Sequence, residues 1–173
     1  MSRQYDELVL AIYPTAKGIA YTLFQAPLSP VDWGIKRVRG QSKNANARCL
    51  EIVAQLCKSL RPDTIVLEAF DPNTSNKSER LKRLHALIVA HCEAENLTLA
   101  RYSRQRVQDT FREAGAITRY EIAHAIATYI PALAHRKPPI RKLWQTEDQR
   151  LSLFDAAALA LTHYAFVPAE EPP

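Results

Sequence analysis

The chain has 173 residues and a mass of 19.6 kDa, a size at which one domain can bury a hydrophobic core without disulfides or metals. Apolar residues make up 47% and charged residues 24%, which excludes a disordered chain, a collagen-like fibre and a disulfide-rich secreted module. The 23 Lys and Arg against 18 Asp and Glu give a formal net charge of +5. This surplus permits a nucleic-acid partner without requiring one.

The N-terminal segment and the cysteines predict a cytoplasmic protein. Residues 1–7 contain no apolar signal core, and no apolar run in the chain approaches the length of a membrane span. Cys49, Cys57 and Cys92 are odd in number and lack the CxxC spacing of a zinc site or a redox motif. We therefore expect them to be small core residues in a reducing compartment, away from any membrane.

Three strands are predicted at the start of the chain. Residues 8–13 and 19–24 are apolar runs rich in strand formers, and residues 32–39 alternate apolar with basic side chains. Pro and Gly separate the three runs. Because the connections are short, the strands are expected to form an antiparallel meander.

The hydrophobic period then changes to that of a helix. Apolar residues recur at helical spacing over residues 49–60, with Ser42 or Asn44 as the cap. Residues 64–67 follow as a short, wholly apolar strand, which should be covered on both faces. Because a helix connects it to the meander, this strand is expected to lie parallel to the first.

The second half of the chain predicts helices around one further strand, at residues 98–102. Helices should begin at Ser78, at Ser103 and at Thr118, where Glu121 completes a capping box. The helix after Ser78 should bury Leu81, Leu84, Leu87, Ile88 and Cys92, and a last helix, capped near Thr146 and Gln149, should bury Leu151, Phe154, Ala158, Leu161 and Ala165.

These elements predict one domain over residues 1–167, followed by a loose tail at residues 168–173. The fold class is α/β: a mixed sheet of about five strands, antiparallel in its first three and parallel thereafter, with helices on both faces.

Two acidic residues lie at positions where an ionised carboxylate without a partner is costly. Glu68 ends the apolar fourth strand, at the sheet edge where open α/β sheets bind ligands. Asp155 borders the apolar stripe of the last helix, so its carboxylate needs a cation, a hydrogen-bond donor or a metal. For each residue the alternative is a structural carboxylate bonded to an Arg or to a backbone amide.

Three passages resemble RuvC-type Holliday junction resolvases, a family of the ribonuclease H-like superfamily. Residues 10–18 resemble the first strand and turn, residues 65–68 the fourth strand with its terminal Glu, and residues 154–163 the last helix, which ends in Thr-His. The resemblance runs from Leu8 to Tyr164 and implies a ribonuclease H-like fold.

The resemblance also implies phosphodiester cleavage by two divalent ions, held close together by carboxylates. The family's ligands are an Asp on strand one, the Glu on strand four, and two acidic or His residues one turn apart on the last helix. Here strand one carries Tyr13, and Ser152 precedes Asp155 by one turn, so Glu68 and Asp155 alone remain. We therefore expect weak or absent Mg²⁺ binding at this pair and little or no cleavage.

Basic residues cluster along the chain, as phosphate contacts require. The first cluster is Lys36, Arg37, Arg39, Lys43 and Arg48, and the last is Arg136, Lys137, Arg141 and Lys142. The resemblance places the helix after Glu68 near DNA and near a dimer interface, so the residues predicted to bind nucleic acid are Lys77, Arg80, Lys82, Arg83, Arg104 and Arg106. A solvated basic face is the alternative for each cluster.

Three functions stay open. The first is a catalytically impaired RuvC-like protein that binds branched or structured DNA as a homodimer. The second is an active metal-dependent endodeoxyribonuclease whose rearranged site adds Asp71 or Asp148 to Glu68 and Asp155. The third is a partner-binding protein that has lost nucleic-acid function. Salt-sensitive binding of junction DNA would separate the third from the others, and cleavage would separate the first two.

Overall fold

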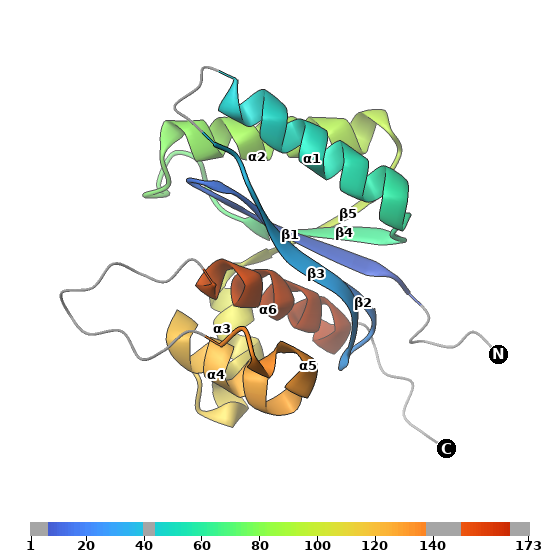
Figure 1. The fold of residues 1–173 in the computed structure, drawn as a ribbon. Helices are drawn as coiled ribbons and strands as arrows, with labels where there is room; N and C mark the ends of the chain where they lie inside the picture. The colour runs from blue at the N-terminus through green and yellow to red at the C-terminus, as the bar shows by residue number, and fades with distance from the viewer. Residues whose placement is uncertain (1–6, 40–43, 138–149, 167–173) are drawn as a thin grey trace.

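A computed structural model describes residues 7–39, 44–137 and 150–166, and a five-stranded sheet forms its centre (Figure 1). The strands are β1 (Val9–Thr15), β2 (Gly18–Ala26), β3 (Ser29–Arg37), β4 (Thr64–Ala69) and β5 (Thr98–Ser103), in the spatial order β3-β2-β1-β4-β5. β1 pairs antiparallel with β2 and parallel with β4. β3 is antiparallel to β2, and β5 is parallel to β4. The predicted mixed sheet is confirmed.

Helices cover both faces of the sheet, as predicted (Figure 1). On one face lie α1 (Ala45–Leu60) and α2 (Glu79–Ala94). On the other face α6 (Leu151–Phe166) packs directly on β1 and β2, and α4 (Arg119–Tyr129) packs on α6. The remaining helices of this second layer are α3 (Arg104–Phe111), the 3-10 turn η1 (Arg112–Ala114) and α5 (Pro131–Ala134). None of the described helices is long and apolar enough to cross a membrane.

The side chains of β1 divide between two cores. Leu10 and Ile12 point into the layer of α1 and α2, whereas Val9 and Ala11 point into the layer of α6. All four are fully buried. Successive side chains of a strand point to opposite faces, so burial on both faces explains why residues 8–13 form a continuous apolar run.

The predicted helix caps at Ser78, Ser103 and Thr118 are confirmed. The Ser78 hydroxyl accepts a hydrogen bond from the backbone N–H of Leu81 at 3.3 Å, and the Ser103 and Thr118 hydroxyls accept equivalent bonds at 3.2 and 3.1 Å. Asn44 precedes α1, without a capping bond from its side chain among the described residues. The caps fix where α3 and α4 begin, and with them the positions of Arg104 and Arg119.

Three expectations need correction. Leu87, predicted to lie in the core, is 41% exposed, because it lies beside the line of Leu84, Ile88 and Cys92 that α2 buries. β3 begins at Ser29 and includes Pro30. Proline has no backbone N–H to donate, and an edge strand tolerates it because one side of that strand has no partner strand. α5 forms where the sequence predicts no element. Lys43, the loop beyond residue 137, the cap at Thr146 and the tail at residues 168–173 lie outside the described residues.

The turn between β1 and β2 is held by Arg80 from α2. One guanidinium nitrogen of Arg80 donates to the carbonyl oxygens of Thr15 and Ala16 at 3.2 and 2.7 Å. A second nitrogen donates to the side-chain oxygen of Asn46 at 3.1 Å. Gly18 closes the turn at a φ of +152°, where a Cβ would lie 2.0 Å from the carbonyl oxygen of Lys36. The carboxyl end of β1 is thereby fixed in place.

Thr118→Ala should lower the free energy of unfolding by about 1 kcal/mol, because the backbone N–H of Glu121 loses its acceptor. The matched control is Thr128→Ala, in the exposed last turn of the same helix, where Ala is the better helix former and no loss is expected. Urea unfolding followed by circular dichroism measures both. Equal losses in the two variants would show that Thr118 does not act as a cap.

Candidate active site

Tyr13 and Glu68 lie near the carboxyl ends of two neighbouring parallel strands, β1 and β4. The paired residues of β1 and β4 run from Val9 with Thr64 to Ala11 with Val66, and both strands continue beyond them. The period of two places Tyr13 on the face of Ala11, and Glu68 on the face of Val66. Ala11 and Val66 belong to the core beneath α6. Both side chains therefore face α6 at the carboxyl edge of the sheet, the edge predicted to hold a ligand.

Asp155 of α6 joins these two residues around a small pocket. Its polar lining also includes Arg104 and Arg119, and the rest of the lining is Val107, Gln108, Ile122, Ala158 and Leu159. The pocket volume is about 40 Å³, room for only a few water molecules. The fold therefore brings together Tyr13, Glu68 and Asp155, three of the four predicted positions.

Asp155 forms a two-pronged ion pair with Arg119. Nε of Arg119 donates to Oδ1 of Asp155 at 3.1 Å, and Nη2 donates to Oδ2. The two side chains are 24% and 15% exposed. Two parallel N–H···O bonds are the strongest geometry for an Arg and a carboxylate, and they fix orientation as well as charge. This is the satisfied structural carboxylate that the sequence left open as an alternative.

Glu68 also has a cation from its own chain. Nζ of Lys77 lies 2.9 Å from Oε2 of Glu68, with the two side chains 25% and 17% exposed. The same Nζ lies 5.4 Å from the ring centroids of Tyr13 and Phe70. Cζ of Arg119 lies 5.9 Å from the ring centroid of Tyr13. The Tyr13 ring thus contacts both cations, within the range of cation–π attraction.

The phenol of Tyr13 stays neutral here. Burial raises its pKa well above the usual value, and the negative charges of Asp155 and Glu68 raise it further. The positive charges of Arg119 and Arg104 oppose this shift only in part. A neutral phenol can donate or accept a hydrogen bond, but it does not supply the negative oxygen that an Asp would supply to a metal.

These side chains do not fit a pair of divalent ions. Hard ions of this kind need several carboxylate oxygens, and both carboxylates here already pair with cations of the chain. Ser152, the fourth predicted position, is 5% exposed and does not line the pocket. Over residues 7–39, 44–137 and 150–166, no group of three or more His, Cys, Asp or Glu could hold a metal.

The two acids considered for a rearranged site do not join this pocket in the described structure. Asp71 is exposed, and its Oδ1 accepts a hydrogen bond from the backbone N–H of Asn73 at 2.9 Å, which closes a loop turn. Asp148 lies outside the described residues.

The basic residues predicted to bind nucleic acid divide into two groups. Three are engaged within the chain: Arg80 at the β1–β2 turn, Lys77 with Glu68, and Lys82 with Glu79 at 3.3 Å. The side chains of Arg83, Arg104 and Arg106 are exposed; Arg104 also lines the site pocket, and Arg106 also interacts electrostatically with Tyr102.

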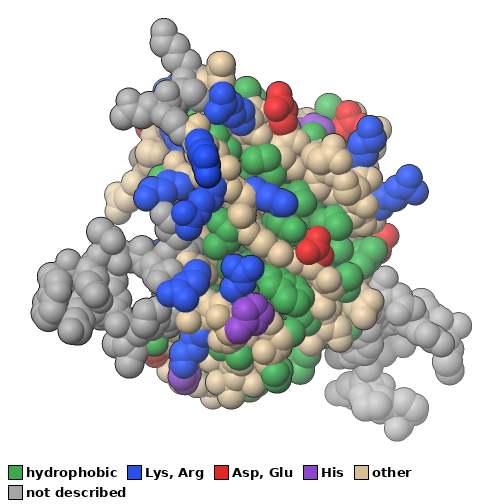
Figure 2. Space-filling view, viewed as in Figure 1, with side chains coloured by type: hydrophobic (Ala, Val, Ile, Leu, Met, Phe, Trp, Pro, Cys, Tyr) green, Lys and Arg blue, Asp and Glu red, His purple; other side chains and the backbone are tan. Residues whose placement is uncertain are grey.

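A second basic surface lies at the end of β3, and the predicted site residues did not include it. Two hollows of about 540 and 440 Å³ share Lys36 and Arg37 in their linings. The other cations of this β3 strip are Arg39, Arg48, Arg136 and Arg150. Figure 2 shows Lys and Arg side chains gathered over the upper end of β3 and, lower, near the start of α6. The signal was present in the sequence as the acid-free run from Lys36 to Arg48.

The β3 strip and the site pocket lie at the same end of the sheet. Arg37 pairs with Gly18, and Gly18 pairs with Thr15 at the end of β1. Because neighbouring strands are about 5 Å apart, the end of β3 is about 10 Å from the end of β1. One extended polyanion could therefore contact both surfaces.

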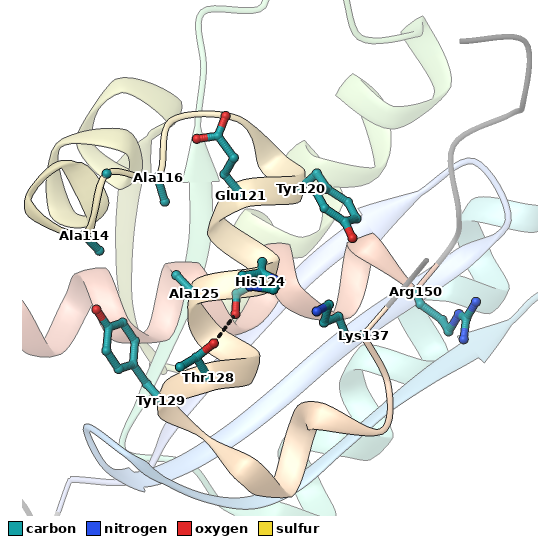
Figure 3. A pocket seen from close by; sticks show the side chains of 11 residues that line it. Ala114, Ala116, Tyr120, Glu121, His124, Ala125, Thr128, Tyr129, Lys137 and Arg150 are labelled. Atoms are coloured by element: carbon teal, nitrogen blue, oxygen red, sulfur yellow. Dashed lines mark hydrogen bonds between the residues drawn. The ribbon is translucent and has the colours of Figure 1, made fainter. Parts of the chain in front are cut away.

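A hollow of about 1030 Å³ lies against α4, and none of its described lining residues lines the site pocket. Figure 3 shows Tyr120, His124 and Tyr129 around it, and Glu121 is the single acid among its described lining residues. The described part of its lining offers no pair of carboxylates, so its greater volume does not make it the chemical site.

No protein-family model matches the chain, and no curated protein sequence does. Solved structures do match it. RuvC of Thermus thermophilus matches at 17% identity and a TM-score of 0.64, over 90% of this chain and 92% of that one. The same protein in complex with a Holliday junction substrate matches at 15% identity and a TM-score of 0.63, over 91% and 92% of the two chains. Ydc2, the yeast mitochondrial Holliday junction resolvase, matches at 15% identity and a TM-score of 0.65, over 92% of this chain and 78% of that one.

At these identities the likeness establishes the fold. The strand order, the two helical layers and the placement of Tyr13, Glu68 and Asp155 agree with the fold that the sequence predicted. The chain has the RuvC-like, ribonuclease H-like fold.

Proposed function

We propose that this protein binds branched or structured DNA through a RuvC-like fold and cleaves it poorly or not at all. The observation that carries the proposal is the state of the two carboxylates. Glu68 and Asp155 each pair with a cation of the chain, around the neutral phenol of Tyr13. Such a site lacks the negative charge with which two metal ions would be held for phosphodiester cleavage.

DNA as the partner is supported by the neighbours and by the position of the charge. One of the matching structures holds a Holliday junction substrate. In this chain Arg83, Arg104 and Arg106 are exposed, and Arg104 lines the site pocket. The β3 strip extends the basic surface along the same end of the sheet. We assign Arg80 to the β1–β2 turn instead, because its guanidinium is hydrogen-bonded there.

We further propose that the protein acts in the cytoplasm as a homodimer, since a four-way junction offers two equivalent faces to a two-fold partner. Sedimentation equilibrium measures the oligomeric state with and without junction DNA. A monomer under both conditions would rule out the dimer.

Binding of a synthetic four-way junction should weaken steeply as salt rises, because each neutralised phosphate releases counterions. Lys36→Gln with Arg37→Gln should make the slope of log K against log salt shallower by about 2. The control is Lys58→Gln with Arg61→Gln, two exposed cations at the far end of α1, which should leave the slope unchanged. Salt-independent or absent binding would favour a partner-binding protein without nucleic-acid function.

The purified protein should leave a labelled four-way junction intact in Mg²⁺ or Mn²⁺, because Glu68 and Asp155 are already neutralised. Denaturing gels of the labelled strands measure this. Metal-dependent nicking that Glu68→Gln abolishes would establish the active-nuclease alternative.

A further inference from the structure

We propose that Lys77 and Arg119 are resident cations at the Glu68–Asp155 site, so that the site excludes divalent ions and binds a DNA phosphodiester without a metal. The inference rests on the proposed DNA-binding function and concerns the same pocket. It names the ligand, a phosphate monoanion of a nucleic-acid strand, and the groups that prepare the pocket for it.

Both cations are held in position by local structure. Arg119 is the first residue of α4, directly after the cap at Thr118, and its fork is oriented by both oxygens of Asp155. Lys77 comes from the loop before α2, where its backbone N–H donates to the hydroxyl oxygen of Ser75 at 3.1 Å. Its ammonium lies between Glu68 and the rings of Tyr13 and Phe70. Both positive charges belong to side chains of the protein, so neither has to be supplied by a bound metal ion.

The charge of the site favours a phosphate. Glu68 and Asp155 supply two negative charges, while Lys77, Arg119 and Arg104 supply three positive ones. Counted over the described residues, and with Tyr13 neutral, one positive charge remains. Without Lys77 and Arg119 the same groups would carry one net negative charge, which attracts a metal cation and repels a phosphate.

A divalent ion would have to bind beside two positive charges or displace them from partly buried carboxylates. Removing one partner of such a pair leaves a charge without compensation, which is costly away from water. The Tyr13 ring would also have to lose its contacts with two cations. A phosphate displaces neither cation, because it can approach the exposed Arg104 from solvent without entering the small pocket.

The first test measures metal binding by the full-length protein alone, with free Mn²⁺ followed by electron paramagnetic resonance. The wild type should bind Mn²⁺ weakly. The variant Lys77→Gln with Arg119→Gln should bind it at least about tenfold more tightly, a gain of 1.4 kcal/mol. The control Lys58→Gln with Arg61→Gln removes the same charge far from the site and should behave as the wild type. Equal Mn²⁺ affinity in the wild type and the site variant would overturn the proposal.

A charge-preserving variant shows whether a change in Mn²⁺ affinity comes from the lost positive charges or from loss of folding. Lys77→Arg with Arg119→Lys keeps both positive charges, so its Mn²⁺ affinity should stay at the wild-type level. Circular dichroism shows whether each variant is folded. If the Gln variant unfolds, the test moves to Lys77→Gln alone, which leaves the Arg119–Asp155 pair intact and should still tighten Mn²⁺ binding.

The second test measures junction affinity in EDTA and in Mg²⁺ by fluorescence anisotropy. The wild type should bind equally in both. The Gln variant should lose about tenfold or more in EDTA, and Mg²⁺ should restore part of that loss. A wild type that requires Mg²⁺ for junction binding would contradict the proposal. Absence of junction binding in every condition would count against the DNA-binding function, whereas the Mn²⁺ titration would still decide whether Lys77 and Arg119 exclude metal ions.

Discussion

The pairing of β1 on its two sides is the constraint on which the rest of the molecule depends. β1 is antiparallel to β2 and parallel to β4, and its core residues are buried on both faces of the sheet. Once that register is set, Tyr13 must face α6 beside Glu68, because side chains alternate along a strand. The Arg80 hydrogen bonds then fix the end of β1, where the pocket opens.

Within that pocket electrostatics, not size, determines the chemistry. Two carboxylates in a half-buried pocket must be neutralised, by a metal or by a side chain. This chain supplies the cations itself, from the loop before α2 and from the first turn of α4. In our proposal the site therefore favours a phosphate over a metal cation although the fold is RuvC-like, which illustrates why a fold alone does not specify an activity.

The basic surfaces follow from the same framework. β3 is an edge strand, and its Lys36 and Arg37 end at the edge of the sheet where β1 and β4 carry the site. The long hairpin of β2 and β3 brings these charges within about 10 Å of the end of β1. In the proposed binding mode the site holds one phosphate and the β3 strip holds the neighbouring ones, so that together they define a path for a nucleic-acid strand.

The sequence by itself predicted the order of the strands and of the long helices, and the caps at Ser78, Ser103 and Thr118, because each depends on residues near one another in the chain. The parallel direction of the fourth strand followed from the helix that connects it to the meander. It also indicated that Glu68 and Asp155 need partners. Only the tertiary structure decided what those partners are. Arg119 lies 36 residues from Asp155, and Arg80 lies 65 residues from Thr15. No local pattern records which cation reaches which carboxylate, since that choice is made by the packing of α2, α4 and α6 around the end of β1.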